Sequence, residues 1–181
     1  MVPIKSWATA KARLAGALTP AEREQLALRC ATTVLAAARP LPVFVVCDDA
    51  AVASWAISQG ATVVTPTGSG LNHAVASGRQ AAHRAGHARV LVVHSDLPNA
   101  TDLASLDDHS AEVIVVPDRH HDGTNALLVP SDGAFEFCYG PGSFDAHCAQ
   151  AQQLGLSLRV VDRPDLALDL DTLGDLRAAG L

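Results

Sequence analysis

Short continuous apolar runs alternate along this chain with longer stretches in which apolar residues recur at helical spacing. A continuous apolar run of four to eight residues is typical of a strand buried on both faces, as in parallel sheets covered by helices. Such runs predict strands at residues 2–4, 42–47, 61–65, 89–93 and 112–116. The intervening stretches predict helices at residues 20–38, 50–59, 71–85 and 102–107. We therefore expect an α/β fold with a mostly parallel sheet between two helical layers.

Cap residues support these boundaries. Thr19 stands directly before Pro20, and this pair is favoured as an N-cap followed by a first-turn proline. Gly60 and Gly86 follow the ends of two predicted helices, where glycine commonly terminates a helix.

The last third of the chain departs from the alternation. Short β-like pieces at residues 126–129 and 134–137 precede a predicted helix at 143–154 and a strand at 157–161. The closing segment LALDLDTLGDLRAAGL predicts a short strand and then a helix capped by Thr172. We expect this part to form a small β excursion of the sheet, inside one domain that spans residues 1–181.

Composition narrows the function classes. The net charge is −6 without a basic stripe, which argues against a nucleic-acid partner. No apolar run is long enough for a membrane span or a signal peptide, so we expect a cytoplasmic protein without a membrane partner. The four cysteines form no CxxC pair, which indicates neither a zinc site nor a redox motif. An anionic substrate would need a few local cations or a bound metal.

The stretch VLVVHSDLP places a carboxylate directly after a predicted strand. Ligands of open α/β sheets bind beyond the carboxyl ends of the strands, and Pro98 prevents the strand from continuing. Asp96 is therefore a candidate active-site residue, although it would equally suit the cap of the following helix. His94 either contacts a metal-bound water or is a partly buried histidine with satisfied hydrogen bonds.

Asp169 and Asp171 in LALDLDT form a second acidic element. In an extended segment, residues i and i+2 point to the same face, and two adjacent carboxylates repel unless a cation lies between them. Mg²⁺ prefers such oxygen ligands, and together with Asp96 the pair would hold one or two Mg²⁺ ions about 4 Å apart. The alternative is an exposed strand end at which one aspartate caps the final helix.

Two further segments carry groups that suit a nucleotide. Lys5, Lys11 and Arg13 lie in the loop between the first predicted strand and helix, where they could hold a triphosphate or simply be solvated. The stretch TGSGLNHAV is a glycine-bearing turn that enters a helix. Its backbone amides and the Asn72 amide could bind a base edge or a ribose, and the alternative is an ordinary helix start.

The segments DGTNALLV and YGPGSF form a third constellation. Gly140 and Gly142 flank Pro141, and Ser143 is the predicted N-cap of the next helix. Open amides at that helix start, together with the Ser143 and Thr124 hydroxyls, would suit one phosphate monoester. A glycine-proline turn with a capped helix explains the same residues without a ligand.

Taken together, these segments resemble the guanylyltransferases of deazaflavin coenzyme F-420 biosynthesis, relatives of the molybdenum-cofactor nucleotidyltransferases. The matching segments are VPIKSWATAKARL, GLNHAV, SDLP, VPDRHHDGTNAL, FCYGPGSFDAH and LDLDT, in the same order over nearly the whole chain. The chain starts almost at VPIK, and HHDGTN departs from the usual glycine-containing run before GTN. The resemblance implies a three-layer αβα, Rossmann-like, nucleotide-diphospho-sugar-transferase-like fold. It also implies Mg²⁺ on the three aspartates and a phosphorylated three-carbon acid on Thr124, Gly140 and Ser143.

The implied reaction joins the GMP moiety of GTP to the phosphate of phosphoenolpyruvate and releases pyrophosphate. The attacking phosphate has a second pKa of about 6, so no general base is required. Asp96 and Lys11 are the candidate catalytic residues, and the expected nucleotide-binding residues are Lys5, Lys11, Arg13 and Asn72. The product would pass to a downstream transferase. The oligomeric state is left open, and a homodimer is one possibility.

Several alternatives stay open. The acceptor could instead be 2-phospho-L-lactate or a phosphoglycerate, or a related nucleotidyltransferase could use another acceptor. Two alternatives belong to other classes of protein. One is a non-catalytic nucleotide-binding domain in which the aspartates only cap helices, and the other is a metal-free methyl- or glycosyltransferase.

Overall fold

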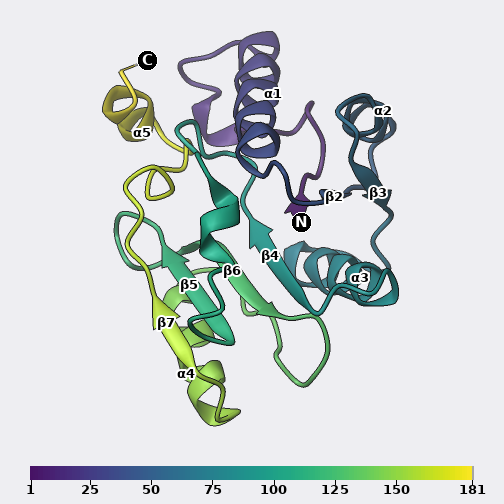
Figure 1. Ribbon diagram of the computed structural model, residues 1–181. Helices are drawn as coiled ribbons and strands as arrows, with labels where there is room; N and C mark the ends of the chain where they lie inside the picture. The colour runs from purple at the N-terminus through teal and green to yellow at the C-terminus, as the bar shows by residue number, and fades with distance from the viewer. Residues whose placement is uncertain (181) are drawn as a thin grey trace.

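A three-stranded and a four-stranded sheet lie edge to edge in the computed structural model of this chain, which describes residues 1–180 (Figure 1). The strands are β1 (Val2–Pro3), β2 (Phe44–Val46), β3 (Thr62–Val64), β4 (Arg89–Val93), β5 (Val113–Pro117), β6 (Thr124–Pro130) and β7 (Leu158–Val160). The helices are α1 (Pro20–Ala37), α2 (Ala50–Ser58), α3 (Leu71–Arg84), α4 (Ser143–Gln153) and α5 (Leu173–Ala178), with 3₁₀ turns η1 (Ala12–Leu14) and η2 (Leu103–Leu106).

Met1 joins the two sheets through backbone hydrogen bonds to β4. Its nitrogen donates to the Leu91 carbonyl at 2.7 Å, and the Val93 nitrogen donates to the Met1 carbonyl at 3.0 Å. The strand order across the joint is therefore β3-β2-β1-β4-β6-β5-β7. Only β6 runs against its neighbours, because it pairs antiparallel with both β4 and β5 while β7 is parallel to β5. The expected mostly parallel sheet is confirmed.

The reversal of β6 decides which residues meet at the functional edge of the sheet. Ala126 pairs with Val93 at the end of β4, and Thr124 pairs with Pro117 at the end of β5. The beginning of β6 therefore lies beside the carboxyl ends of its neighbours. Thr124 is placed at the same edge as the residues that follow β4.

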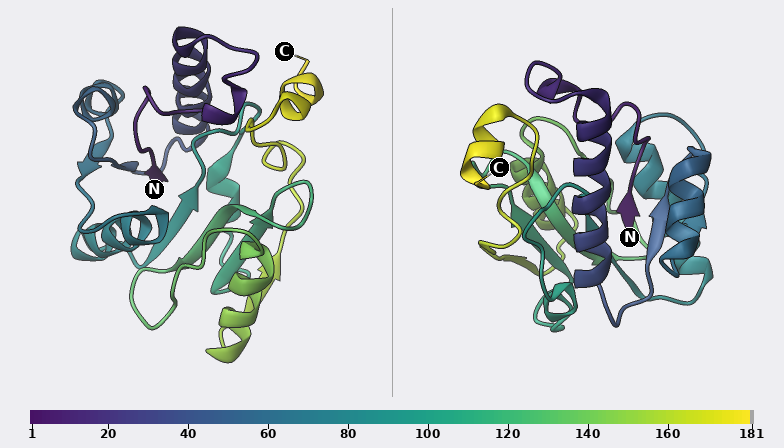
Figure 2. Two further views of the ribbon diagram at one scale, coloured as in Figure 1. Left: turned by 180° about the vertical axis from the view of Figure 1, so that it is seen from behind. Right: turned by 90° about the horizontal axis from the view of Figure 1, so that it is seen from above.

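Alternating side chains of the central strands enter two separate hydrophobic clusters. Ile114 and Val116 pack with α1 and α2, whereas Val113 and Val115 pack with α3 and α4 on the other face. The view from behind in Figure 2 shows α3 and α4 in front of the sheet. The expected three-layer αβα arrangement is confirmed. None of the helices within residues 1–180 is both long and apolar enough to cross a membrane.

Local signals in the sequence explain where the helices start and how closely they pack. Thr19 and Glu22 form a reciprocal capping box at α1, and the Asp49 side chain caps α2. Gly78 of α3 lies so close to the sheet that a Cβ atom there would be 2.7 Å from Val46 Cγ2. The lack of a side chain at this position lets α3 approach β2.

A third, small cluster connects the two ends of the chain. It contains Leu14 of η1, Leu26 and Cys30 of α1, Leu170, and Leu176 of α5. Figure 1 shows α5 beside α1, far from the strand that precedes it in the sequence. Because Leu14 follows Lys11 and Arg13 closely, and Leu170 lies between Asp169 and Asp171, this packing brings the basic loop and the acidic segment together.

Three local expectations are wrong. Residues 134–137 are not a strand: β6 already has a partner on each edge, and Phe135 and Phe137 instead pack into the cluster under α3 and α4. Residues 166–171 are also irregular: the Asn125 side chain donates to the Leu166 and Ala167 carbonyls, and the Leu170 nitrogen makes a single backbone hydrogen bond, to the Asp96 carbonyl.

The third correction concerns the start of α4. Gly142 is its N-cap, in a left-handed conformation with φ of 71°, and Ser143 is the first helical residue. Glycine adopts this conformation without strain, so the cap position passes to Gly142 and the Ser143 side chain turns into the protein.

Candidate active site

A lysine from the first loop lies between two aspartates from distant parts of the chain. Lys11 Nζ is 2.8 Å from Asp96 Oδ2 and 3.9 Å from Asp171 Oδ1. Arg13 Nη1 binds Asp171 Oδ2 at 2.8 Å, on the more exposed side of the same group. These contacts gather four of the predicted site residues at the carboxyl ends of β1 and β4. Asp96 is not a helix cap here, because η2 has no side-chain cap.

Burial and neighbouring charges shift the pKa values of two aspartates in this cluster. Burial alone would raise the pKa of Asp96, but the Lys11 ammonium and His94 hold that pKa below its usual range. The pKa of Asp169 is raised, first by burial and then by the nearby charge of Asp96. Asp169 therefore belongs to the same electrostatic cluster, and a cation at this place would favour its ionised form.

The cluster has features that fit a divalent cation. Asp96 Oδ1 is buried and has no hydrogen-bond partner among residues 1–180, so a strong acceptor is left unsatisfied. The three carboxylates are hard oxygen ligands of the kind that Mg²⁺ takes. Across the described chain, however, no three His, Cys, Asp or Glu side chains form a ready-made ligand set. In this conformation the Lys11 ammonium balances the carboxylates itself, and the metal site stays a prediction.

A pocket of about 440 Å³ opens at the same edge of the sheet as this cluster. It opens at the ends of β1 and β2 and against the turn that leads into α3, and its lining includes Lys5, Asp48, Gly68, Ser69 and Gly70. Gly68 and Gly70 have φ values of 121° and 88°, which other residues rarely adopt. The pocket has the size of a small-ligand site, and of the predicted nucleotide-binding residues Lys5 lines it, whereas Lys11, Arg13 and Asn72 do not.

Asn72 has a different surrounding from the one we expected. Its Nδ2 donates to the Tyr139 carbonyl at 3.2 Å, and its Oδ1 accepts from the Tyr139 nitrogen at 2.8 Å. In this structure the side chain joins α3 to the loop before α4. Its role in reading a base or ribose remains a prediction.

The predicted acceptor residues lie together at the start of β6 and α4. The Ser143 hydroxyl donates to Thr124 Oγ1 at 3.4 Å, and both side chains are buried. Gly140 has a φ of 144° and is exposed. The Gly142 nitrogen already donates to Asp122 Oδ1 at 3.2 Å. A phosphate would therefore reach the two hydroxyls only if the covering chain moves.

Two side chains at this edge, Tyr139 and His147, were assigned no role from the sequence, and His94 was left with two alternatives. His94 Nε2 and the Tyr139 hydroxyl are buried without a partner in the described part of the chain, so the chain itself does not satisfy His94 at this nitrogen. Their rings are 5.3 Å apart. His147 is fully buried and contacts Thr124. Its position four residues after Ser143, on the same helix face, is the signal that could have revealed it.

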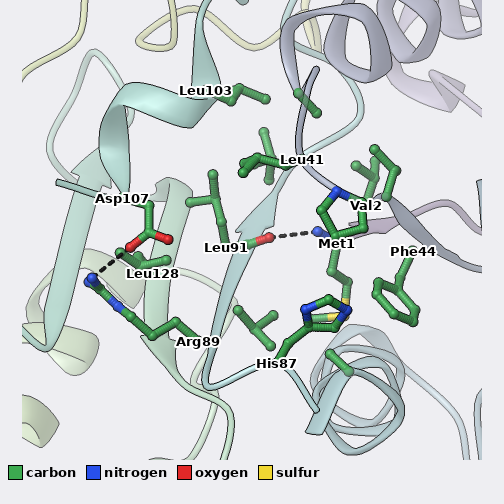
Figure 3. A pocket seen from close by; sticks show the side chains of 16 residues that line it. Met1, Val2, Leu41, Phe44, His87, Arg89, Leu91, Leu103, Asp107 and Leu128 are labelled. Carbon is green, nitrogen blue, oxygen red and sulfur yellow. Dashed lines mark hydrogen bonds and ion pairs between the residues drawn. The ribbon is translucent and has the colours of Figure 1, made fainter. Parts of the chain in front are cut away.

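A second cavity, of about 130 Å³, is remote from this chemistry (Figure 3). It surrounds the start of β4, at the opposite end of that strand from Asp96, and its lining is mainly apolar. The ion pair between Arg89 and Asp107 (2.6 Å) stands at its side, as Figure 3 shows. Nothing in this lining resembles the predicted site, so we assign the functional edge to the cluster around Asp96.

Comparison with solved structures identifies the fold. A protein from Desulfovibrio desulfuricans G20, assigned as a nucleotide-diphospho-sugar transferase, superimposes with a TM-score of 0.78 at 15% identity. The match covers 98% of this chain and 84% of that protein. The expected nucleotide-diphospho-sugar-transferase-like fold is confirmed.

Comparison with known sequences identifies the family. A relative from Chloroflexus aggregans, named phosphoenolpyruvate guanylyltransferase, is 37% identical over 97% of this chain and 93% of its own length. A relative from Methanothermobacter thermautotrophicus, named 2-phospho-L-lactate guanylyltransferase, is 33% identical over 97% of this chain and 81% of its own length. The family model described as "Guanylyl transferase CofC like" matches residues 1–179. The chain therefore belongs to the CofC-like guanylyltransferase family.

Proposed function

We propose that this protein transfers the GMP moiety of GTP to the phosphate of phosphoenolpyruvate in a Mg²⁺-dependent reaction of coenzyme F-420 biosynthesis. The observation that carries the proposal is the meeting of Lys11, Asp96 and Asp171 at the edge of the sheet where a ligand-sized pocket also opens, in a chain of this family. In the reaction, an acceptor phosphate oxygen bonds to the α-phosphorus of GTP. The bond from that phosphorus to the bridging oxygen breaks, and pyrophosphate leaves.

The site supplies what this reaction needs, which is compensation of negative charge. Two unit charges 4 Å apart repel by about 4 kcal/mol at an effective dielectric of about 20. Lys11 and Arg13 can turn from the aspartates toward the leaving phosphates, and Lys5 lines the pocket at this edge. Mg²⁺ held by Asp96, Asp169 and Asp171 would supply further charge and orient the phosphates. Asp96 and Lys11 are the residues to which we assign the largest contribution to the rate.

The acceptor is assigned to the neighbouring hydroxyls. Thr124, Ser143 and the turn at Gly140 would hold its phosphate, and the second pKa of about 6 leaves that phosphate mostly dianionic at neutral pH. No general base is needed for such a nucleophile. We favour phosphoenolpyruvate over 2-phospho-L-lactate because the relative named for the former is more similar, at 37% against 33% identity.

The proposal is tested by incubating the purified protein with GTP, Mg²⁺ and each candidate acid in turn, and detecting the guanylated product by mass spectrometry. We expect product and equimolar pyrophosphate with phosphoenolpyruvate, and none after chelation of Mg²⁺. Pyrophosphate release with another nucleoside triphosphate or another acid alone would replace our substrate assignment. GTP binding without turnover by any acid would favour a non-catalytic nucleotide-binding domain.

The Asp96→Asn variant is the matched test of the site. It keeps the shape of the side chain and removes the charge that Lys11 balances. We expect turnover to be abolished while the circular dichroism spectrum stays that of the wild type. Near-normal rates of pyrophosphate release would remove Asp96 from the mechanism.

A further inference from the structure

His147 is a fully buried histidine in the middle of the proposed acceptor site. It lies one helical turn after Ser143 in α4, and none of its surface is exposed. Its ring packs between Phe135, with centroids 6.0 Å apart, and Tyr139, with centroids 4.9 Å apart. A buried ring with two nitrogens needs a hydrogen-bond partner for each of them. Both partners are present, and they fix the chemistry of the ring.

The hydrogen bonds determine which nitrogen carries the proton. The Cys138 backbone nitrogen donates to His147 Nε2 at 3.0 Å, and because a backbone N–H can only donate, Nε2 has no hydrogen. In neutral imidazole the single hydrogen is then on Nδ1, which lies 3.0 Å from Thr124 Oγ1. Burial, with a smaller contribution from His94, lowers the pKa of His147 to about 4, so the ring is neutral at neutral pH. Nδ1 therefore donates to the Thr124 hydroxyl.

Because Thr124 accepts this hydrogen bond, its own hydrogen is left to be donated elsewhere. A hydroxyl has one hydrogen to donate and two lone pairs that accept. His147 fills one lone pair of Thr124, and in the substrate-free protein the Ser143 hydroxyl, at 3.4 Å, fills the other. When Ser143 turns to donate to an acceptor phosphate, the His147 donation still directs the Thr124 hydrogen away from the ring. Among residues 1–180 no acceptor receives the hydrogen of Thr124 itself. The hydroxyl is thereby restricted to donating toward whatever binds beside it.

The same ring also orders the other part of the acceptor site. Through Cys138 it holds the start of the segment that leads to Gly140, and Asn72 holds Tyr139, the next residue, from α3. Two helices thus fix the backbone directly before the Gly140 turn. A single side chain connects this backbone to the hydroxyl of Thr124.

We propose that His147 is a positioning residue that turns Thr124 into a donor-only hydroxyl and thereby selects an acceptor oxygen that carries no hydrogen. A deprotonated phosphate oxygen has only lone pairs and suits such a donor, whereas a hydroxyl or a protonated phosphate would present a second hydrogen. The inference rests on the proposed function and deepens it, because it assigns the recognition of the acceptor's ionised phosphate to a residue that does not touch the substrate.

Steady-state kinetics of matched variants test the inference. In His147→Gln the side-chain carbonyl can still accept from Cys138, but the donor to Thr124 is lost. We expect the KM for the phosphorylated acid to rise about 10- to 100-fold, the range for losing a hydrogen bond to a charged group, with little change in the KM for GTP. His147→Asn can place an amide N–H near the position of Nδ1 and should recover part of this loss.

A double variant separates positioning from a general structural effect. Thr124→Val removes the hydroxyl on which His147 acts, so adding His147→Gln to it should raise the acceptor KM no further. His83→Gln is the control, since His83 also contacts a serine hydroxyl, Ser131 at 3.2 Å, but lies outside the site. Additive losses in the double variant, or equal increases of both KM values in His147→Gln, would overturn the inference.

Nitrogen NMR of the substrate-free protein gives a readout that does not depend on activity. We expect His147 to show a protonated Nδ1 and an unprotonated Nε2 at neutral pH, and a protonated Nε2 would contradict the inference. The two proposals fail in different ways. A wild-type protein that forms no guanylated product overturns both, whereas an active wild type with an unchanged acceptor KM in His147→Gln overturns this one alone.

Discussion

Lys11 and Asp96, separated by 85 positions, form an ion pair of 2.8 Å whose side chains are only 6% and 22% exposed. The pair shows that the carboxylates of this site are not left uncompensated, because the chain supplies its own cation. It also indicates that Lys11 must exchange partners before it can contact a triphosphate. Under the proposed function, Lys11 and a divalent ion would compete for the carboxylate oxygens, and the carboxylates and the triphosphate would compete for Lys11.

Replacing the ammonium should make the protein depend on an added cation for stability. Lys11→Met leaves Asp96 buried without its partner, and we expect the free energy of unfolding to fall by about 2–3 kcal/mol. Millimolar MgCl₂ should restore part of this loss in the variant and change the wild type less, as measured by urea unfolding with and without the salt. An equal response of both proteins to Mg²⁺ would show that Lys11 and the ion do not compete.

Asp175 holds the acidic segment in place without belonging to the site itself. Its Oδ2 accepts from the backbone nitrogens of Asp171 and Thr172, and its Oδ1 pairs with Arg119. Asp175→Asn should lower the free energy of unfolding by about 2 kcal/mol and weaken Mn²⁺ binding, because Asp171 loses its support. Both effects are measurable by urea unfolding and by titration with Mn²⁺ as a Mg²⁺ substitute.

Glu22→Gln provides the control for this prediction. Glu22 completes the corresponding capping box at the start of α1, where it is exposed and its carboxylate accepts from Thr19 and not from the backbone of Asp171. It should change stability less than Asp175→Asn and leave Mn²⁺ affinity unaltered. A loss of Mn²⁺ affinity in Glu22→Gln would mean that helix capping in general, and not the Asp175 contact, controls the site.

The buried His147 should make stability pH-dependent in a defined window. Its folded pKa of about 4 lies below the unfolded value of about 6.5, so between these values the unfolded chain binds more protons. The stabilisation is complete above about pH 6.5 and decreases as the pH falls toward 4. By about pH 5 the wild type should have lost about 2 kcal/mol relative to neutral pH through this group alone. His147→Gln should lack this component in urea unfolding at the two pH values, and parallel losses in both proteins would refute it.

The close approach of α3 to the sheet predicts a strong effect of a very small substitution. A Cβ on Gly78 would meet Val46 Cγ2 at 2.7 Å and the Met1 sulfur at 1.9 Å. Gly78→Ala should therefore lower the free energy of unfolding by about 1–3 kcal/mol, despite the better helix propensity of alanine. Gly16→Ala is the control, since a Cβ atom at this position would have no other atom within 4 Å. Thermal unfolding that ranks the two variants in the opposite order would contradict the packing described for α3.

Strands and helices with strong local signals were predictable from the sequence. The capping box at Thr19, the apolar run that ends at Val93, and the glycine turn before Leu71 all predicted elements within a few residues of the observed ones. The position of Asp96 just beyond the carboxyl end of β4 was predicted from the apolar run that precedes it. These features are determined by residues close together in the sequence, and for this reason they can be predicted from one sequence alone.

The features that failed depend on contacts between distant residues. Residues 134–137 have a strand-like composition, but both edges of the preceding strand β6 are already paired. Residues 166 and 167 bond to the Asn125 side chain instead of a strand. Thr124 reaches the site because β6 is reversed, which its own sequence does not reveal. The pairing of Lys11 with two aspartates likewise depends on the packing of Leu14 against Leu170.

The two hydrogen bonds between the Asn72 side chain and the Tyr139 backbone have the pattern of those between two backbone peptide groups. A side-chain amide there donates to a carbonyl and accepts from the nitrogen of the same residue, as an adjacent strand would. The segment before α4 is thus held in place without joining either sheet. Replacement by aspartate would delete the donor half of this pattern, so among natural variants we expect an amide at this position wherever the loop keeps its present course.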